Sequence, residues 1–134
     1  MRQRAVRQFP RTEVAGELAR DFTGEVLRAW NVPELTDQAG TIVTELVTNA
    51  LHHTHSEPQV RLNLRRGICT IAVADDDPRL VELDEQRDPM EPGLGLKIVA
   101  QLARAWGCSR TWAGGKVVWA TLRVPAGHHR PARR

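Results

Sequence analysis

The stretch Glu45-Leu-Val-Thr-Asn49-Ala-Leu-His-His53 places two polar residues, Glu45 and Asn49, in a pattern otherwise typical of a packed helix. Residues four apart lie on the same face of a helix, one turn from each other. Asparagine is a poor residue for a helix interior, so its position here needs a reason. An amide oxygen is a suitable Mg²⁺ ligand beside phosphate oxygens and water, and a glutamate one turn earlier can accept a proton from a hydroxyl attacking a γ-phosphate. A solvated helix face without chemistry is the alternative interpretation.

This helix is expected to run from Pro33 to about His53, and a second helical pattern precedes it at Thr12 to Trp30. Thr12 is the expected N-terminal cap of the earlier helix. The apolar residues of that helix recur about once per turn and predict a stripe facing the core: Val14, Leu18, Phe22, Val26, Leu27 and Trp30. A short strand-like segment, Ala5 to Phe9, comes before both helices.

The pattern after the central helix changes to a period of two, which is typical of strands. Val60 to Leu64 and Ile68 to Val73 flank a turn at Arg66-Gly67 and predict a hairpin. A third helix is expected from Leu94 to about Trp106, ended by Gly107, and a last hairpin joins two strands through Gly114-Gly115. The strands of that hairpin are expected at Cys108 to Trp112 and Lys116 to Val124. This order predicts an α+β fold, a two-layer sandwich with helices on one face of a mixed, mostly antiparallel sheet.

The length of 134 residues predicts one domain, residues 1–124, followed by a disordered basic tail, residues 125–134. The two cysteines lack the spacing of a metal site or a disulfide framework, and no apolar run reaches the roughly 18 residues of a membrane span. We therefore expect a cytoplasmic protein. The net charge of +3 comes mostly from arginines at the two ends, so nucleic-acid binding is disfavoured.

Two further motifs are compatible with a nucleotide site. Asp75 follows an apolar strand, where a carboxylate can accept a hydrogen bond from the amino group of adenine, although a strand-end aspartate is also an ordinary turn residue. Gly93-Leu-Gly-Leu96 opens the third helix, where backbone N–H groups and the helix dipole favour phosphate. A simple junction between a loop and a helix is the alternative for this second motif.

The order of the three motifs resembles the GHKL superfamily of ATPases and kinases, whose N box and two glycine boxes lie on the same secondary structures. The resemblance covers about residues 12–124. Within the superfamily, Glu45-Leu-Val-Thr-Asn-Ala, the segment Gly114-Gly-Lys-Val-Val-Trp119 and the short length are similar to the serine/threonine kinases that act as anti-sigma factors.

The resemblance implies ATP and Mg²⁺ as cofactors, with Glu45 as general base and Asn49 as Mg²⁺ ligand. His53 would neighbour the nucleotide and Asp75 would select adenine. The phosphates would be held by the second glycine box and the residue after it: Gly93, Leu94, Gly95, Leu96 and Lys97. Residues 76–92 would form a lid over ATP. A sigma factor, a small antagonist protein or both would be the partners, and a homodimer is possible.

The sequence departs from the superfamily at the first glycine box, which usually reads Asp-x-Gly-x-Gly. Here Asp75 is followed by Asp76-Asp77-Pro78. Glycine lets the backbone pass close to the base, whereas proline restricts the chain and removes a donor. This departure supports an alternative function, a non-catalytic binding module of the same fold with weak or no nucleotide binding.

Overall fold

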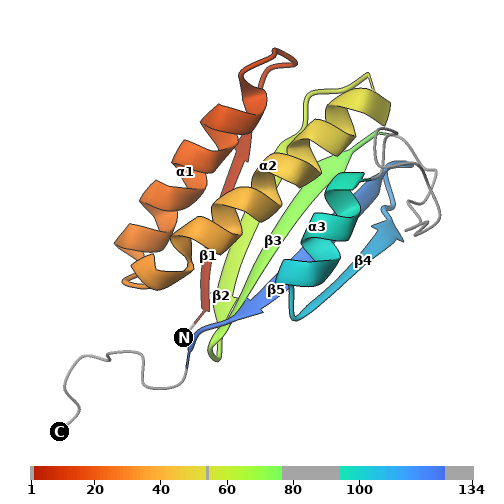
Figure 1. The fold of residues 1–134 in the computed structure, drawn as a ribbon. Coiled ribbons are helices and arrows are strands. Elements are labelled where there is room, and N and C mark those ends of the chain that lie inside the picture. Colours follow the sequence, from red (N-terminus) through yellow and green to blue (C-terminus); the bar gives the residue numbers. More distant parts are fainter. Residues whose placement is uncertain (1, 54, 77–93, 126–134) are drawn as a thin grey trace, which may run out of the picture.

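The computed structural model describes residues 2–53, 55–76 and 94–125 (Figure 1). In chain order, its elements are β1 (Arg2–Gln8), α1 (Ala15–Ala29), a 3₁₀ turn (Pro33–Leu35), α2 (Thr36–His53), β2 (Gln59–Arg65), β3 (Ile68–Asp75), α3 (Leu94–Leu102), β4 (Ala105–Arg110) and β5 (Lys116–Arg123).

The five strands form one sheet in the order β1-β2-β3-β5-β4, and all four pairings are antiparallel. The three helices lie on one face of this sheet, with α2 running across its middle (Figure 1). The prediction of a two-layer α+β sandwich with a mostly antiparallel sheet is confirmed.

The core lies between the two layers. Strand residues such as Val60, Leu62 and Ile71 face the helices and are fully buried, because side chains alternate between the faces of a strand. Helix α2 contributes a matching apolar side that is equally buried: Ile42, Val43, Leu46, Val47 and Ala50. The burial of α2 on both its α1 and sheet sides explains why its sequence is more apolar than that of α1.

The first helix differs from the expected one at its beginning. Helix α1 starts at Ala15, and no side-chain hydrogen bond caps it, so the prediction of Thr12 as the cap is wrong. The carbonyl of Thr12 instead accepts a hydrogen bond from the N–H of Ala15 in a turn. The predicted stripe is buried at Phe22 and Leu27, but Val14 and Leu18 are 47% and 40% exposed.

The third helix is shorter than expected and ends at Leu102. Trp106 and Gly107 belong to β4, where they pair with Ala120 and Trp119 of β5. A Cβ atom at Gly107 would meet the ring of Trp119, so this glycine allows a tryptophan to lie against the neighbouring strand. Local sequence suggested a helix end, and pairing with β5 overrides it.

No helix in the described part of the chain is both long and apolar enough to cross a membrane. Most of the expected lid, from residue 77 on, and residues 126–134 of the expected tail lie outside the described residues.

Candidate nucleotide site

Helix α2 carries the first pair of expected site residues. Glu45 and Asn49 are each half-buried and lie one turn apart, between the fully buried side formed by residues such as Leu46 and Ala50 and the solvent-exposed side of the helix. His53 is the last residue of α2. The helical arrangement that the sequence predicted for Glu45 and Asn49 is present.

The three motifs come together at one end of the sandwich. The C-terminal half of α2, the C-terminal end of β3 and the first turn of α3 lie at this end, beside the start of β5 (Figure 1). The helix dipole of α3 is directed with its positive end toward it, which favours anions. Residues far apart in the sequence thus share one region.

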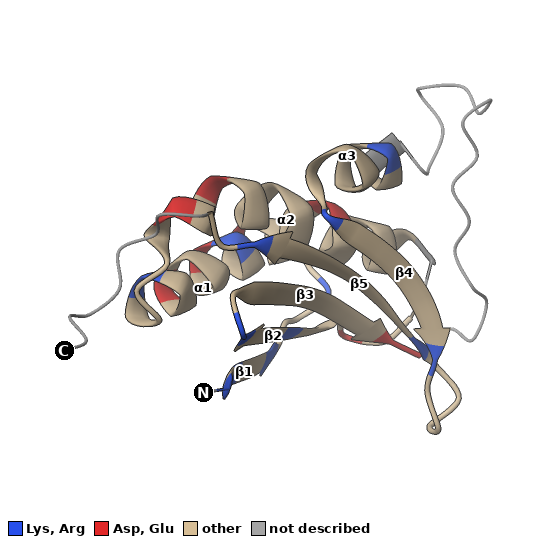
Figure 2. Cartoon of the chain, turned by 90° about the horizontal axis from the view of Figure 1, so that it is seen from below, with Lys and Arg blue, Asp and Glu red and all other residues tan. Residues whose placement is uncertain are grey.

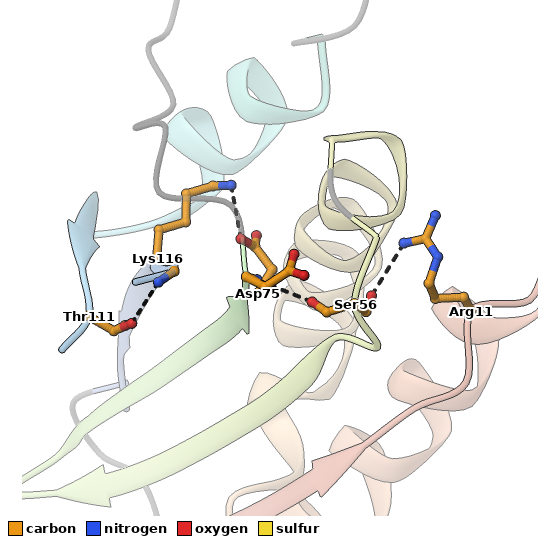
Figure 3. A network of polar contacts seen from close by, with 7 residues as sticks. Arg11, Ser56, Asp75, Thr111 and Lys116 are labelled. Carbon is orange, nitrogen blue, oxygen red and sulfur yellow. Dashed lines mark hydrogen bonds and ion pairs between the residues drawn. The ribbon is translucent and has the colours of Figure 1, made fainter. Parts of the chain in front are cut away.

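Asp75 is the last residue of β3 and forms a buried ion pair with Lys116, the first residue of β5 (Figure 3). The Nζ atom of Lys116 lies 3.1 Å from Oδ1 of Asp75, and both side chains are 1% exposed. The two residues are direct cross-strand partners and point to the helix side of the sheet. The carboxylate expected at the base therefore has a cation beside it.

The turn before β5 packs tightly against this pair. The N–H of Gly115 donates a hydrogen bond of 3.1 Å to Oγ1 of Thr111 (Figure 3). A Cβ atom at Gly115 would overlap the backbone carbonyl of Asp75. Glycine at this position allows the turn to approach the end of β3, and the start of β5 is fixed next to Asp75.

A second set of contacts joins the end of β3 to the segments around α2. The N–H of Asp76 donates to Oγ of Ser56 at 3.1 Å. The guanidinium of Arg11 donates to the carbonyl of Ser56 at 3.3 Å (Figure 3) and to the carbonyl of Leu51 at 3.0 Å. Carbonyls in the last turn of a helix lack partners within it, so Arg11 satisfies one of those of α2.

The expected phosphate-binding segment is described only in part. Leu94 and Gly95 are the first two residues of α3, whereas Gly93 lies outside the described residues. Leu96 is buried in the core, so its side chain packs and does not face a ligand. Lys97 is half-buried on the first turn of the helix.

The residues present fit a magnesium nucleotide better than a metal held by protein alone. Within the described residues, no three histidine, cysteine, aspartate or glutamate side chains are grouped as metal ligands. Mg²⁺ commonly takes one or two protein oxygens together with substrate phosphates and water. The amide oxygen of Asn49 is a protein ligand of that kind.

A two-layer sandwich with these three motifs at one end is the architecture of GHKL-type ATP-binding domains. Residues 9–122 match the family model described as the histidine kinase-like ATPase domain. The chain belongs to this family, and an ATPase domain implies ATP as its ligand.

Solved structures agree with this assignment. The crystal structure of the RsbU and RsbW domains of Rv1364c from Mycobacterium tuberculosis is 20% identical, with a TM-score of 0.69, over 98% of this chain and 34% of that chain. The histidine kinase domain of a blue-light activated histidine kinase from Erythrobacter litoralis EL346 is 28% identical, with a TM-score of 0.51, over 69% of this chain and 46% of that chain. The chain thus spans less than half of each of these two solved chains. Among curated protein sequences, none is significantly similar to it.

Sequence reasoning did not assign Lys116, Ser56 or Arg11 to the site. The sequence does indicate Lys116. It stands at a position of its strand that faces the helices, as the buried residues Val118 and Ala120 do further along. A charged residue at such a position needs a buried partner. The sequence does not indicate Arg11 or Ser56, since Arg11 contacts backbone carbonyls 45 and 40 residues away and Ser56 contacts the N–H of Asp76, 20 residues away.

Proposed function

We propose that this domain binds Mg·ATP and transfers its γ-phosphate to a serine or threonine of a small antagonist protein, as an anti-sigma type protein kinase that binds a sigma factor when the antagonist is absent. The observation that carries the proposal is the position of half-buried Glu45 one turn from Asn49, at the end of the sandwich where Asp75 and the start of α3 lie. Membership of the ATPase family supports the nucleotide.

Each of these residues has a role that its chemistry allows. The Asn49 amide would hold Mg²⁺, which neutralises phosphate charge when bound. Asp75 accepts from the amino group of adenine, and the N-terminus of α3 faces the phosphates. The substrate hydroxyl oxygen forms a bond to the γ-phosphorus as the bond to the β,γ-bridging oxygen breaks. ADP leaves, and Glu45 takes the hydroxyl proton.

The test of the proposed chemistry is the substitution Glu45→Gln, which keeps the size of the side chain and removes the base. Phosphoryl transfer to a small antagonist protein should fall on the order of 10²-fold or more, while ATP affinity stays within a few-fold. Glu25→Gln, an exposed glutamate on α1, is the matched control and should retain activity. Full transfer by the Glu45→Gln protein would contradict the catalytic assignment.

A second candidate function is a non-catalytic binding module of the same fold. The sequence after Asp75 favours it, because Asp76-Asp77-Pro78 stands where glycines usually let the backbone pass close to the base. Titration calorimetry with ATP and ADP separates the two functions. If no heat of binding is measured at millimolar nucleotide, the result favours the non-catalytic binding module.

A further inference from the structure

We propose that Lys116 is a second base-contacting residue of this site, which determines base specificity together with Asp75. In this arrangement Asp75 accepts a hydrogen bond from the amino group of adenine, and the Lys116 ammonium donates to a ring nitrogen next to that amino group. The inference deepens the proposed function and rests on it for the presence of a bound adenine nucleotide.

The position of Lys116 follows from the register of the sheet. Asp75 and Lys116 are opposite each other, in line with the buried pairs Val73–Val118 and Ile71–Ala120 on the helix side. Lys116 therefore points into the same region as the carboxylate expected at the base. The Nζ and Oδ1 atoms lie 3.1 Å apart, and in the proposed arrangement the edge of one flat base meets both side chains.

A structural role alone does not require this residue. Burying a lysine and an aspartate costs desolvation energy that the pair only partly recovers, and apolar residues of similar size often replace such pairs without loss of stability. The positions next along both strands are apolar. Stability alone is therefore a weak reason for a charged pair at the end of these two strands.

The hydrogen-bonding chemistry of the pair matches adenine. A carboxylate only accepts and an ammonium only donates. Adenine presents an amino donor next to a ring acceptor, N7 on one side and N1 on the other. A guanine base places a keto oxygen where adenine has its amino group, which opposes a carboxylate at that point.

The surrounding backbone holds Lys116 in place. Gly115 approaches the Asp75 carbonyl too closely for any side chain, and its N–H is bound by Thr111. Asp75 and Lys116 are also directly paired across β3 and β5, so the start of β5 cannot move away from β3 without breaking that pairing. A fixed donor next to a fixed acceptor is the arrangement that base discrimination needs.

The experiment compares ATP with 1-deaza-ATP and 7-deaza-ATP, in which one ring nitrogen is replaced by C–H, on the unmodified chain and on Lys116→Met. On the unmodified chain, one of the two analogues should bind on the order of tenfold more weakly than ATP, because it loses a charge-assisted hydrogen bond. Lys116→Met should bind ATP and that analogue equally. The analogue that shows the effect identifies the nitrogen.

Two further variants keep the test decisive. Arg123→Met, at the exposed end of the same strand, is the control for loss of a positive charge and should keep the preference for ATP. If Lys116→Met does not fold because Asp75 has lost its cation, Asp75→Asn combined with Lys116→Met replaces the pair by neutral residues, and it should also bind ATP and that analogue equally.

If the unmodified chain and the Lys116 variants bind ATP normally and prefer ATP over the analogues to the same degree, this inference alone is overturned. Failure of the unmodified chain to bind ATP would overturn the proposed function as well. The two failures are therefore distinguishable.

Discussion

At the scale of single residues, Asn49 separates metal binding from nucleotide binding. It is half-buried on α2, one turn after Glu45, and its amide oxygen is the proposed protein ligand of Mg²⁺. Asn49→Ala should weaken the binding of Mg·ATP at least tenfold and leave metal-free ATP nearly unaffected, because a hard cation loses one of few protein ligands. Calorimetry with Mg²⁺ and with EDTA measures both. An equal loss in the two conditions would instead indicate a general packing role.

Cys69 gives a residue-scale prediction about pH. Burial raises the pKa of its thiol from 9.0 to about 12, because the thiolate is poorly solvated in the core. Between these pH values the folded state keeps a proton that the unfolded state has lost, so stability falls as pH rises. The free energy of unfolding should drop by about 1.4 kcal/mol per pH unit in this window.

The control for this prediction is a pair of alanine variants. Cys69→Ala should show a shallower decrease of stability above pH 9 than the unmodified chain, whereas Cys108→Ala, at a half-buried edge-strand position, should not. Denaturant unfolding at several pH values measures the slopes. Equal slopes in all three proteins would contradict the assignment to Cys69.

At the scale of elements, we expect substitution of Gly115 in the last hairpin to reduce stability more than substitution of its neighbour Gly114. Gly115→Ala places a methyl group against the carbonyl of Asp75, and we expect a cost of about 1–3 kcal/mol from the displacement of β3 and β5. Gly114 has a φ of 93° and open space around it, so Gly114→Ala should cost only about 1 kcal/mol.

Thermal unfolding of the two variants, with ATP titration in parallel, tests this difference. Gly115→Ala should also weaken the binding of ATP, since it moves Asp75 and Lys116 apart, while Gly114→Ala should leave ATP binding unchanged. If both variants lose the same stability and bind ATP equally, the hairpin does not position the site.

The elements also show what the sequence could predict. The hairpin of β2 and β3 and helix α2 were predictable because their periodicity is local and their ends carry turn residues such as Arg66-Gly67. The end of α3 could not be predicted in this way. Trp106 and Gly107 pair with β5, and residues close to them in the sequence do not indicate that pairing. The Asp75–Lys116 contact spans 41 residues and needed the register of the sheet.

At the scale of the whole molecule, charge is segregated between the two layers. The face of the sheet away from the helices carries five arginines, and the strands place no aspartate or glutamate on that face. The arginines are Arg2, Arg4, Arg61, Arg65 and Arg123. Figure 2 shows the acidic residues mainly on α1 and α2. Two such basic faces would repel each other, so a symmetric dimer through the open sheet face is disfavoured.

The homodimer implied by the family resemblance therefore needs another surface, and α1 offers one near the N-terminus. Val14 and Leu18 are exposed, four residues apart, and so form a small apolar patch on one side of the helix and its cap.

Light scattering should give about twice 15.0 kDa for the unmodified chain. Leu18→Glu should return the mass to that of a monomer, because it buries an unpaired charge in the interface. Val6→Glu, at an exposed position of the sheet face, should leave the dimer intact. A monomer mass for the unmodified chain at high concentration would contradict the dimer, and an unchanged dimer in Leu18→Glu would place the interface elsewhere.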